Sequence, residues 1–172
     1  PKGTSGEDAR KAVLMTYILN AGTDYGDNAD SVDNPATDFD REPYSAAEVQ
    51  RIIDRQAANS FTYDDDVDFV LGADGALMTT PNGMLMGMGG TWVSAQCSWK
   101  GGTAWGEVFM ENIDHAHGPA RQLRQIVESG TSWNVGADGV PRAGSLDLDR
   151  LLHHEEMHSR QWADKGYFGM LW

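Results

Sequence analysis

Apolar residues recur at helical spacing near both ends of the chain. Helices are predicted over residues 7–20, 45–58, 120–128 and 145–165. The second opens with Ser45-Ala46-Ala47-Glu48, the capping-box pattern of a helix start. Ser145 or Asp147 can cap the fourth, no Pro or Gly interrupts it, and Gly166 follows as a natural stop.

Between the second and third helices, the pattern changes to short apolar runs separated by glycine-rich turns. Strands are predicted over Val67–Leu71, Ala76–Thr79, Met84–Met88, Thr91–Ser98 and Ala104–Met110, with a short one at Thr131–Val135. The first two read as a hairpin across Gly72-Ala73-Asp74-Gly75, and Asp64-Asp65-Asp66 reads as a turn.

Hairpin-like spacing, rather than alternating strand and helix units, predicts an α+β fold. We expect N-terminal helices, a central and mostly antiparallel sheet from about Val67 to Val135, and a C-terminal helix. The length of 172 residues fits a single domain over residues 1–172, which could be a piece of a longer chain.

Candidate chemistry lies on the fourth predicted helix, in His154-Glu155-Glu156-Met157-His158, an H-E-x-x-H motif. Residues four apart share one face of a helix, so His154 and His158 can bind one zinc ion. Glu155 is placed to accept a proton from a water on that metal. The alternative to a zinc site is an ordinary surface helix with charged residues. His153 should point elsewhere, and Glu156 should tolerate exchange to Gln.

The stretch from Leu151 to Gly166 resembles the active-site helix of zincin-type metallopeptidases, in particular bacterial zincin-like domains with an H-E-x-x-H-x-x-Q helix. Gln161 and Gly166-Tyr167-Phe168 match the Gln, the Gly and the aromatic residues of that extension. Such domains are common in exported bacterial proteins, including toxin-like ones. The resemblance therefore implies a secreted peptidase with Zn²⁺ as cofactor, Glu155 as general base, and an inhibitor or immunity-type protein as a partner.

The third zinc ligand stays open, since a catalytic zinc usually has three protein ligands and a water. Asp164 stands where some zincins place their third ligand, after a glycine that breaks the helix. Gln161 occupies that glycine position here, and on a continuous helix Asp164 points about 80° away from His154 and about 120° away from His158. The other candidates are His115, His117 and a residue in a segment outside this sequence.

The acidic composition of the chain makes two classes of binding partner less expected, namely nucleic acids and anionic membranes. There are 26 Asp and Glu against 13 Lys and Arg, a formal net charge of −13. Such a balance argues against a nucleic-acid-binding surface and against binding to an anionic membrane, because both need clustered cations.

The lone Cys97 is interpreted as a small buried apolar residue. The acidic stretch Thr23–Pro43 reads as a solvated loop rather than a calcium site.

Two functions from different classes follow. The first is a zinc-dependent peptidase in which Glu155 activates water to hydrolyse a protein or peptide substrate. The second is a non-catalytic binding domain on a zincin-like scaffold with an incomplete metal site.

Overall fold

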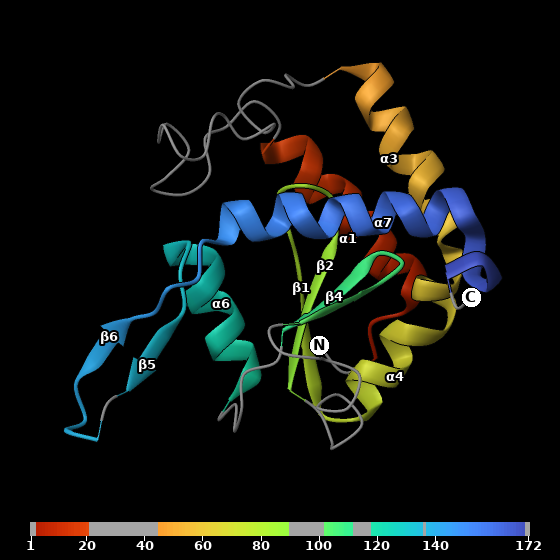
Figure 1. Cartoon of the computed structure of the whole chain (residues 1–172). Helices are drawn as coiled ribbons and strands as arrows, with labels where there is room; N and C mark the ends of the chain where they lie inside the picture. Colours follow the sequence, from red (N-terminus) through yellow and green to blue (C-terminus); the bar gives the residue numbers. More distant parts are fainter. Residues whose placement is uncertain (1–2, 21–44, 90–101, 112–117, 136, 171–172) are drawn as a thin grey trace.

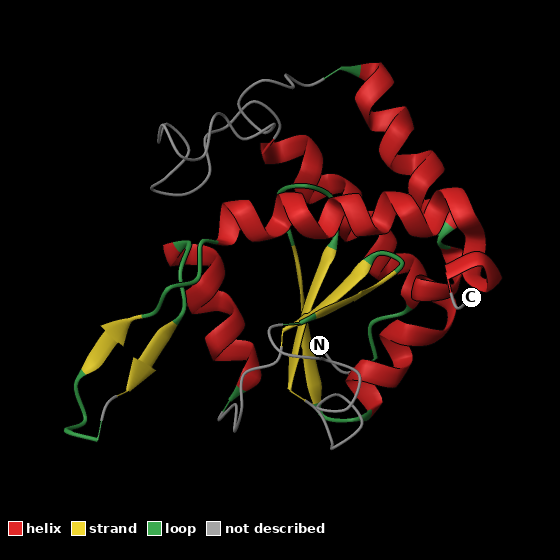
Figure 2. Cartoon of the chain, in the orientation of Figure 1, coloured by secondary structure: helices red, strands yellow, loops and turns green. Residues whose placement is uncertain are grey.

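The structure is a computed structural model, and it describes residues 3–20, 45–89, 102–111, 118–135 and 137–170. Its helices are α1 (Gly6–Asn20), α3 (Ala46–Ala58), the π-helical η1 (Thr62–Asp66), α4 (Val67–Gly72), α6 (Pro119–Ser129) and α7 (Leu148–Met170). Its strands are β1 (Gly75–Thr79), β2 (Leu85–Gly89), β3 (Thr103–Trp105), β4 (Val108–Glu111), β5 (Trp133–Val135) and β6 (Pro141–Ala143). The predicted α+β class is confirmed (Figures 1 and 2).

A four-stranded sheet in the order β1-β2-β4-β3 forms the centre. The pairs β1–β2 and β3–β4 are antiparallel, whereas β2 and β4 run parallel, with Met86 beside Phe109. Strands β5 and β6 form a separate hairpin that projects away from this sheet (Figure 1). The predicted strand at Thr131–Val135 therefore exists in part, but it does not belong to the central sheet.

Helices cover both faces of the central sheet, because successive strand residues point to opposite sides. One face packs on α1, η1 and α4, through Ala9, Val13, Tyr63, Val67, Val70, Leu85, Val108 and Met110. The other packs on α6 and α7, through Met86, Met88, Phe109, Leu123, Ile126, Leu148 and Leu152. Met86 and Met88 are fully buried in this second cluster.

The run Val67–Leu71 is helical, which corrects the predicted strand. It belongs to α4, and the predicted turn Asp64-Asp65-Asp66 lies in η1, directly before it. Val67 and Val70 are buried three residues apart, a helical spacing. A short apolar run does not distinguish a buried strand from one face of a helix, which is why the pattern misled.

The predicted strand Ala104–Met110 is two strands that turn at Gly106. This residue has a φ of +56°, and a side-chain carbon there would collide with Oγ1 of Thr62. The hydroxyl of Thr62 accepts a hydrogen bond from the Glu107 amide at 3.0 Å, which fixes the turn against η1. The predicted strand Thr91–Ser98, Cys97 and the whole of Thr23–Pro43 lie outside the described residues.

The predicted C-terminal helix is α7, which crosses the sheet with one buried stripe facing it (Figure 1). The amide of Arg150 donates to Oδ1 of Asp147 at 3.1 Å, so Asp147 caps the start. Gly166, with φ 71° and ψ 166°, interrupts the helix where a stop was predicted. The buried residues of the stripe are Leu148, Leu152, Glu155, Ser159 and Trp162.

Candidate metal and carboxylate site

The two histidines of the motif meet on one flank of α7. The Nε2 atoms of His154 and His158 are 3.0 Å apart, and both side chains are at least partly exposed. Two nitrogens bound to one tetrahedral zinc at about 2.0–2.1 Å would lie roughly 3.3 Å apart. The pair is therefore arranged as two ligands of a single metal ion would be, before any ion is added.

Glu155 lies in the buried stripe rather than beside it. Its side chain is only 5% exposed, between Leu152 and Ser159 along the helix. Its Oε2 atom is buried and has no hydrogen-bond partner among the described residues. Burial raises the pKa of Glu155 to about 7, because nothing nearby compensates the charged form.

Glu111 is a second uncompensated acid, one that the sequence patterns did not single out. It ends β4 two residues after Phe109, so it points to the same face of the sheet, the one that α7 covers. Its Oε2 atom is also buried without a hydrogen-bond partner among the described residues. Burial and the neighbouring charge of Glu155 raise the pKa of Glu111 to about 7.

Two buried acids from distant parts of the sequence, Glu111 on β4 and Glu155 on α7, thus lie close enough to interact electrostatically. Buried carboxylates normally have hydrogen-bond or ionic partners, because an unpaired buried charge is costly. Their pairing depends on strand β4 packing under α7, so no local sequence signal could have revealed it.

Glu156 has the opposite environment, although it is the next residue and is 6% exposed. Its Oε1 atom accepts hydrogen bonds from Arg51 at 2.9 Å, Arg55 at 2.8 Å and Arg160 at 3.1 Å. Burial alone would raise the pKa of Glu156, but the arginines outweigh it and lower the pKa. Glu156 therefore anchors α7 to α3, a role that the sequence pattern did not indicate.

A buried polar network holds the same flank of α7 against the sheet and α3. Glu107 is fully buried and accepts hydrogen bonds from Arg55, Asn59 and Ser159, the last at 2.6 Å. Asn59 also donates to the backbone oxygen of Ser159 at 3.0 Å. These hydrogen bonds fix the position and rotation of α7 against the sheet and α3. His154 and His158 lie on the solvent-exposed part of the helix.

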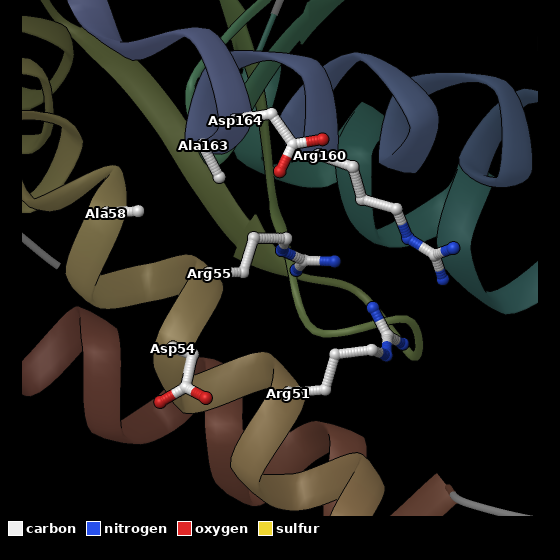
Figure 3. A pocket seen from close by; sticks show the side chains of 7 residues that line it. All are labelled: Arg51, Asp54, Arg55, Ala58, Arg160, Ala163 and Asp164. Carbon is white, nitrogen blue, oxygen red and sulfur yellow. The ribbon is translucent and has the colours of Figure 1, made fainter.

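Asp164 lies on a different side of α7 from the histidines. It lines a cavity of about 370 Å³ between α3 and α7, together with Arg51, Asp54, Arg55, Ala58, Arg160 and Ala163 (Figure 3). Among the described residues, no three His, Cys, Asp or Glu side chains gather closely enough to hold a metal ion. The structure therefore does not bring Asp164 together with His154 and His158.

The remaining predicted residues have simpler outcomes. His115 and His117 lie outside the described residues. The ring of His153 points away from the pair, with Nδ1 3.1 Å from the backbone oxygen of Asp149. That placement agrees with the expectation that His153 is not a ligand.

Comparisons with known proteins identified no similar protein. No protein-family model, no curated protein and no solved structure matches the chain. Among the described residues, no helix combines the length and apolar character that crossing a membrane requires.

Proposed function

We propose that the protein is a zinc-dependent peptidase whose centre lies on the flank of α7 that carries His154 and His158. One observation carries the proposal: Glu155 and Glu156 are adjacent and similarly buried, yet within the described part of the chain only the Glu156 carboxylate has arginine partners. A purely structural helix would pair or avoid both acids. Glu155 directly follows His154 on α7 and its Oε2 atom has no partner among the described residues, which suits a catalytic base with a raised pKa.

The residues present fit a zinc ion in chemistry and in charge. Two imidazole nitrogens 3.0 Å apart offer two ligands to one ion, and a positive charge nearby would favour the buried, unpartnered carboxylates of Glu111 and Glu155. A third protein ligand is not among the described residues. Zinc in such sites supplies Lewis acidity, which lowers the pKa of a water and polarises a carbonyl group.

Within that mechanism, Glu155 has two tasks. Its carboxylate takes a proton from the attacking water, and the carboxylic acid then gives the proton to the departing amine of the peptide. A pKa of about 7 suits both steps, because the group can accept and release a proton near neutral pH. The anchors behind α7, Glu156 and Glu107, keep Glu155 directed at the reacting atoms.

The substrate class is a protein or a peptide, and this part of the proposal depends on the resemblance of α7 to zincin helices. The same resemblance supports a secreted, toxin-like bacterial protein with an inhibitor or immunity-type partner. The strongly acidic composition, with a net charge of −13, makes nucleic acid and anionic membranes poor partners.

The test combines metal content with cleavage. Purified protein should hold one zinc per chain by mass spectrometry, and it should cut members of a mixed peptide library. Glu155→Gln should keep the zinc while its cleavage falls about a hundredfold or more. Equal cleavage by both proteins would overturn the mechanism.

The alternative is a non-catalytic binding domain on a zincin-like scaffold. It is favoured by the finding that only two candidate ligands converge among the described residues. Folded protein that takes up no zinc and cuts no library peptide would establish this alternative.

A further inference from the structure

The imidazole rings of His154 and His158 differ in whether Nδ1, the ring nitrogen outside the contact between the two rings, has a hydrogen-bond partner. Nδ1 of His158 lies 3.2 Å from Oε1 of Gln161, three residues further along the helix. No described residue gives Nδ1 of His154 a comparable partner. The two Nε2 atoms meanwhile face one another at 3.0 Å. The site is therefore asymmetric in its hydrogen bonding, although the motif itself looks symmetric.

This asymmetry has a consequence for where the protons lie. A carboxamide oxygen only accepts hydrogen bonds, so Nδ1 of His158 must carry the proton in the contact with Gln161. A neutral imidazole protonated at Nδ1 has its lone pair at Nε2. Nε2 of His158 is then the acceptor of the contact between the rings, and Nε2 of His154 is the donor.

We propose that Gln161 is a positioning residue that holds His158 in the Nδ1–H tautomer and His154, through His158, in the Nε2–H tautomer. His158 then presents a lone pair to a metal ion without rearrangement. His154 must first release its Nε2 proton to solvent and take up a proton at Nδ1. Gln161 itself touches neither the metal ion nor the substrate.

The proposal extends to metal affinity, and this second part rests on the proposed function. Imidazole ligands bind more tightly when the other ring nitrogen donates to a carbonyl or carboxylate group, and loss of that group commonly costs 10–100-fold in affinity. Gln161 is exposed on the surface of α7, so its exchange should leave the fold intact.

The first experiment reads the tautomers directly, in metal-free protein and mildly alkaline buffer, from two-bond ¹⁵N–¹H correlations of the histidine rings. We expect Nδ1–H at His158 and Nε2–H at His154. In Gln161→Met, His158 should shift toward Nε2–H, the form that free imidazole side chains prefer. A wild-type His158 already protonated at Nε2, or a spectrum unchanged in Gln161→Met, would overturn the proposal.

The matched control is Gln50→Met. Gln50 is also an exposed helical glutamine that bonds within its own helix, with Nε2 2.8 Å from Oδ1 of Asp54. It lies on α3 and touches neither histidine, so the spectra of His154 and His158 should remain unchanged. A change as large as that in Gln161→Met would show that the tautomers respond to general effects and would contradict the proposal.

The second experiment measures zinc affinity by competition with a chromophoric chelator. Gln161→Met should bind zinc 10–100-fold more weakly than wild type, whereas Gln161→Glu should bind at least as tightly, because a carboxylate is a stronger acceptor. Equal affinity in Gln161→Met and wild type would refute the metal part. If wild type takes up no zinc, the proposed function fails, and the tautomer spectra still decide the role of Gln161.

Discussion

At the scale of single residues, Glu155 and Glu156 form a natural matched pair. They are adjacent, 5% and 6% exposed, and differ only in their neighbours. Glu155→Gln should leave the free energy of unfolding of metal-free protein unchanged or raised, since it removes an uncompensated charge. Glu156→Gln should lower it by about 3 kcal/mol, because three arginines lose a buried charged partner.

Urea unfolding of both variants, monitored by circular dichroism, measures the difference. The midpoint concentrations should separate clearly, with Glu156→Gln the lower. Equal losses in the two variants would mean that the environments of the two acids do not differ as described.

Glu111 should make the stability of metal-free protein depend on pH. Its pKa is raised from 4.5 to about 7 by burial and by Glu155, so the folded state binds this proton more tightly than the unfolded state. The stabilising contribution is therefore complete below about pH 4.5 and is lost as the pH rises through about 7. Thermal unfolding of Glu111→Gln should show a flatter decline than wild type between these pH values. Parallel curves for the two proteins would contradict the assignment.

At the scale of elements, α7 shows what a sequence can and cannot reveal. The helix, its cap at Asp147 and its break at Gly166 follow from local rules, and all three are found. The shared flank of His154 and His158 follows from helical geometry alone. The difference between Glu155 and Glu156 does not, because the arginines that pair with Glu156 include two from α3, about a hundred residues earlier.

The strands were harder to predict for a related reason. Turn signals located β2 and α6 closely, but Val67–Leu71 was assigned to a strand because five residues are too few to reveal a period. The role of Glu111 depends on which face of β4 meets α7, and only tertiary packing decides that. Local patterns thus placed the elements, while the partners across elements required the structure.

The buried hydrogen-bond network of Glu107, which holds α7 against the sheet and α3, can be tested by mutation. Glu107→Gln should lower the free energy of unfolding by roughly 3–5 kcal/mol, because Arg55 would lose its fully buried partner. The control is Asp138→Asn, in the exposed pair with Arg142 on the β5–β6 hairpin, which should change stability very little. Guanidinium unfolding compares the two, and similar midpoints would show that the buried network contributes no more than a surface pair.

At the scale of the whole molecule, the sheet has helices on both faces, and the candidate site lies where α7 crosses it (Figure 1). The arginines near α7, namely Arg51, Arg55 and Arg160, line the cavity between α3 and α7 (Figure 3). Among the described residues, the buried Oε2 atoms of Glu111 and Glu155 have no hydrogen-bond partner. One side of α7 is therefore paired with arginines, whereas no described residue supplies a positive charge to Glu111 or Glu155.

Zinc should supply that charge and stabilise the whole fold. A ligand that binds only the folded state raises the free energy of unfolding by RT ln(1 + [L]/Kd), about 2.7 kcal/mol at a free zinc concentration a hundred times Kd. The melting temperature of wild type should rise with added zinc, and chelation should reverse the rise. His154→Ala and His158→Ala should lose most of this response, since a single imidazole with water holds zinc poorly.

His153→Ala is the control on the same helix. The ring of His153 contacts the backbone of Asp149, so the response of this variant to zinc should match that of wild type. A zinc response that survives in both His154→Ala and His158→Ala would place the metal elsewhere and remove the basis for a peptidase centre on α7.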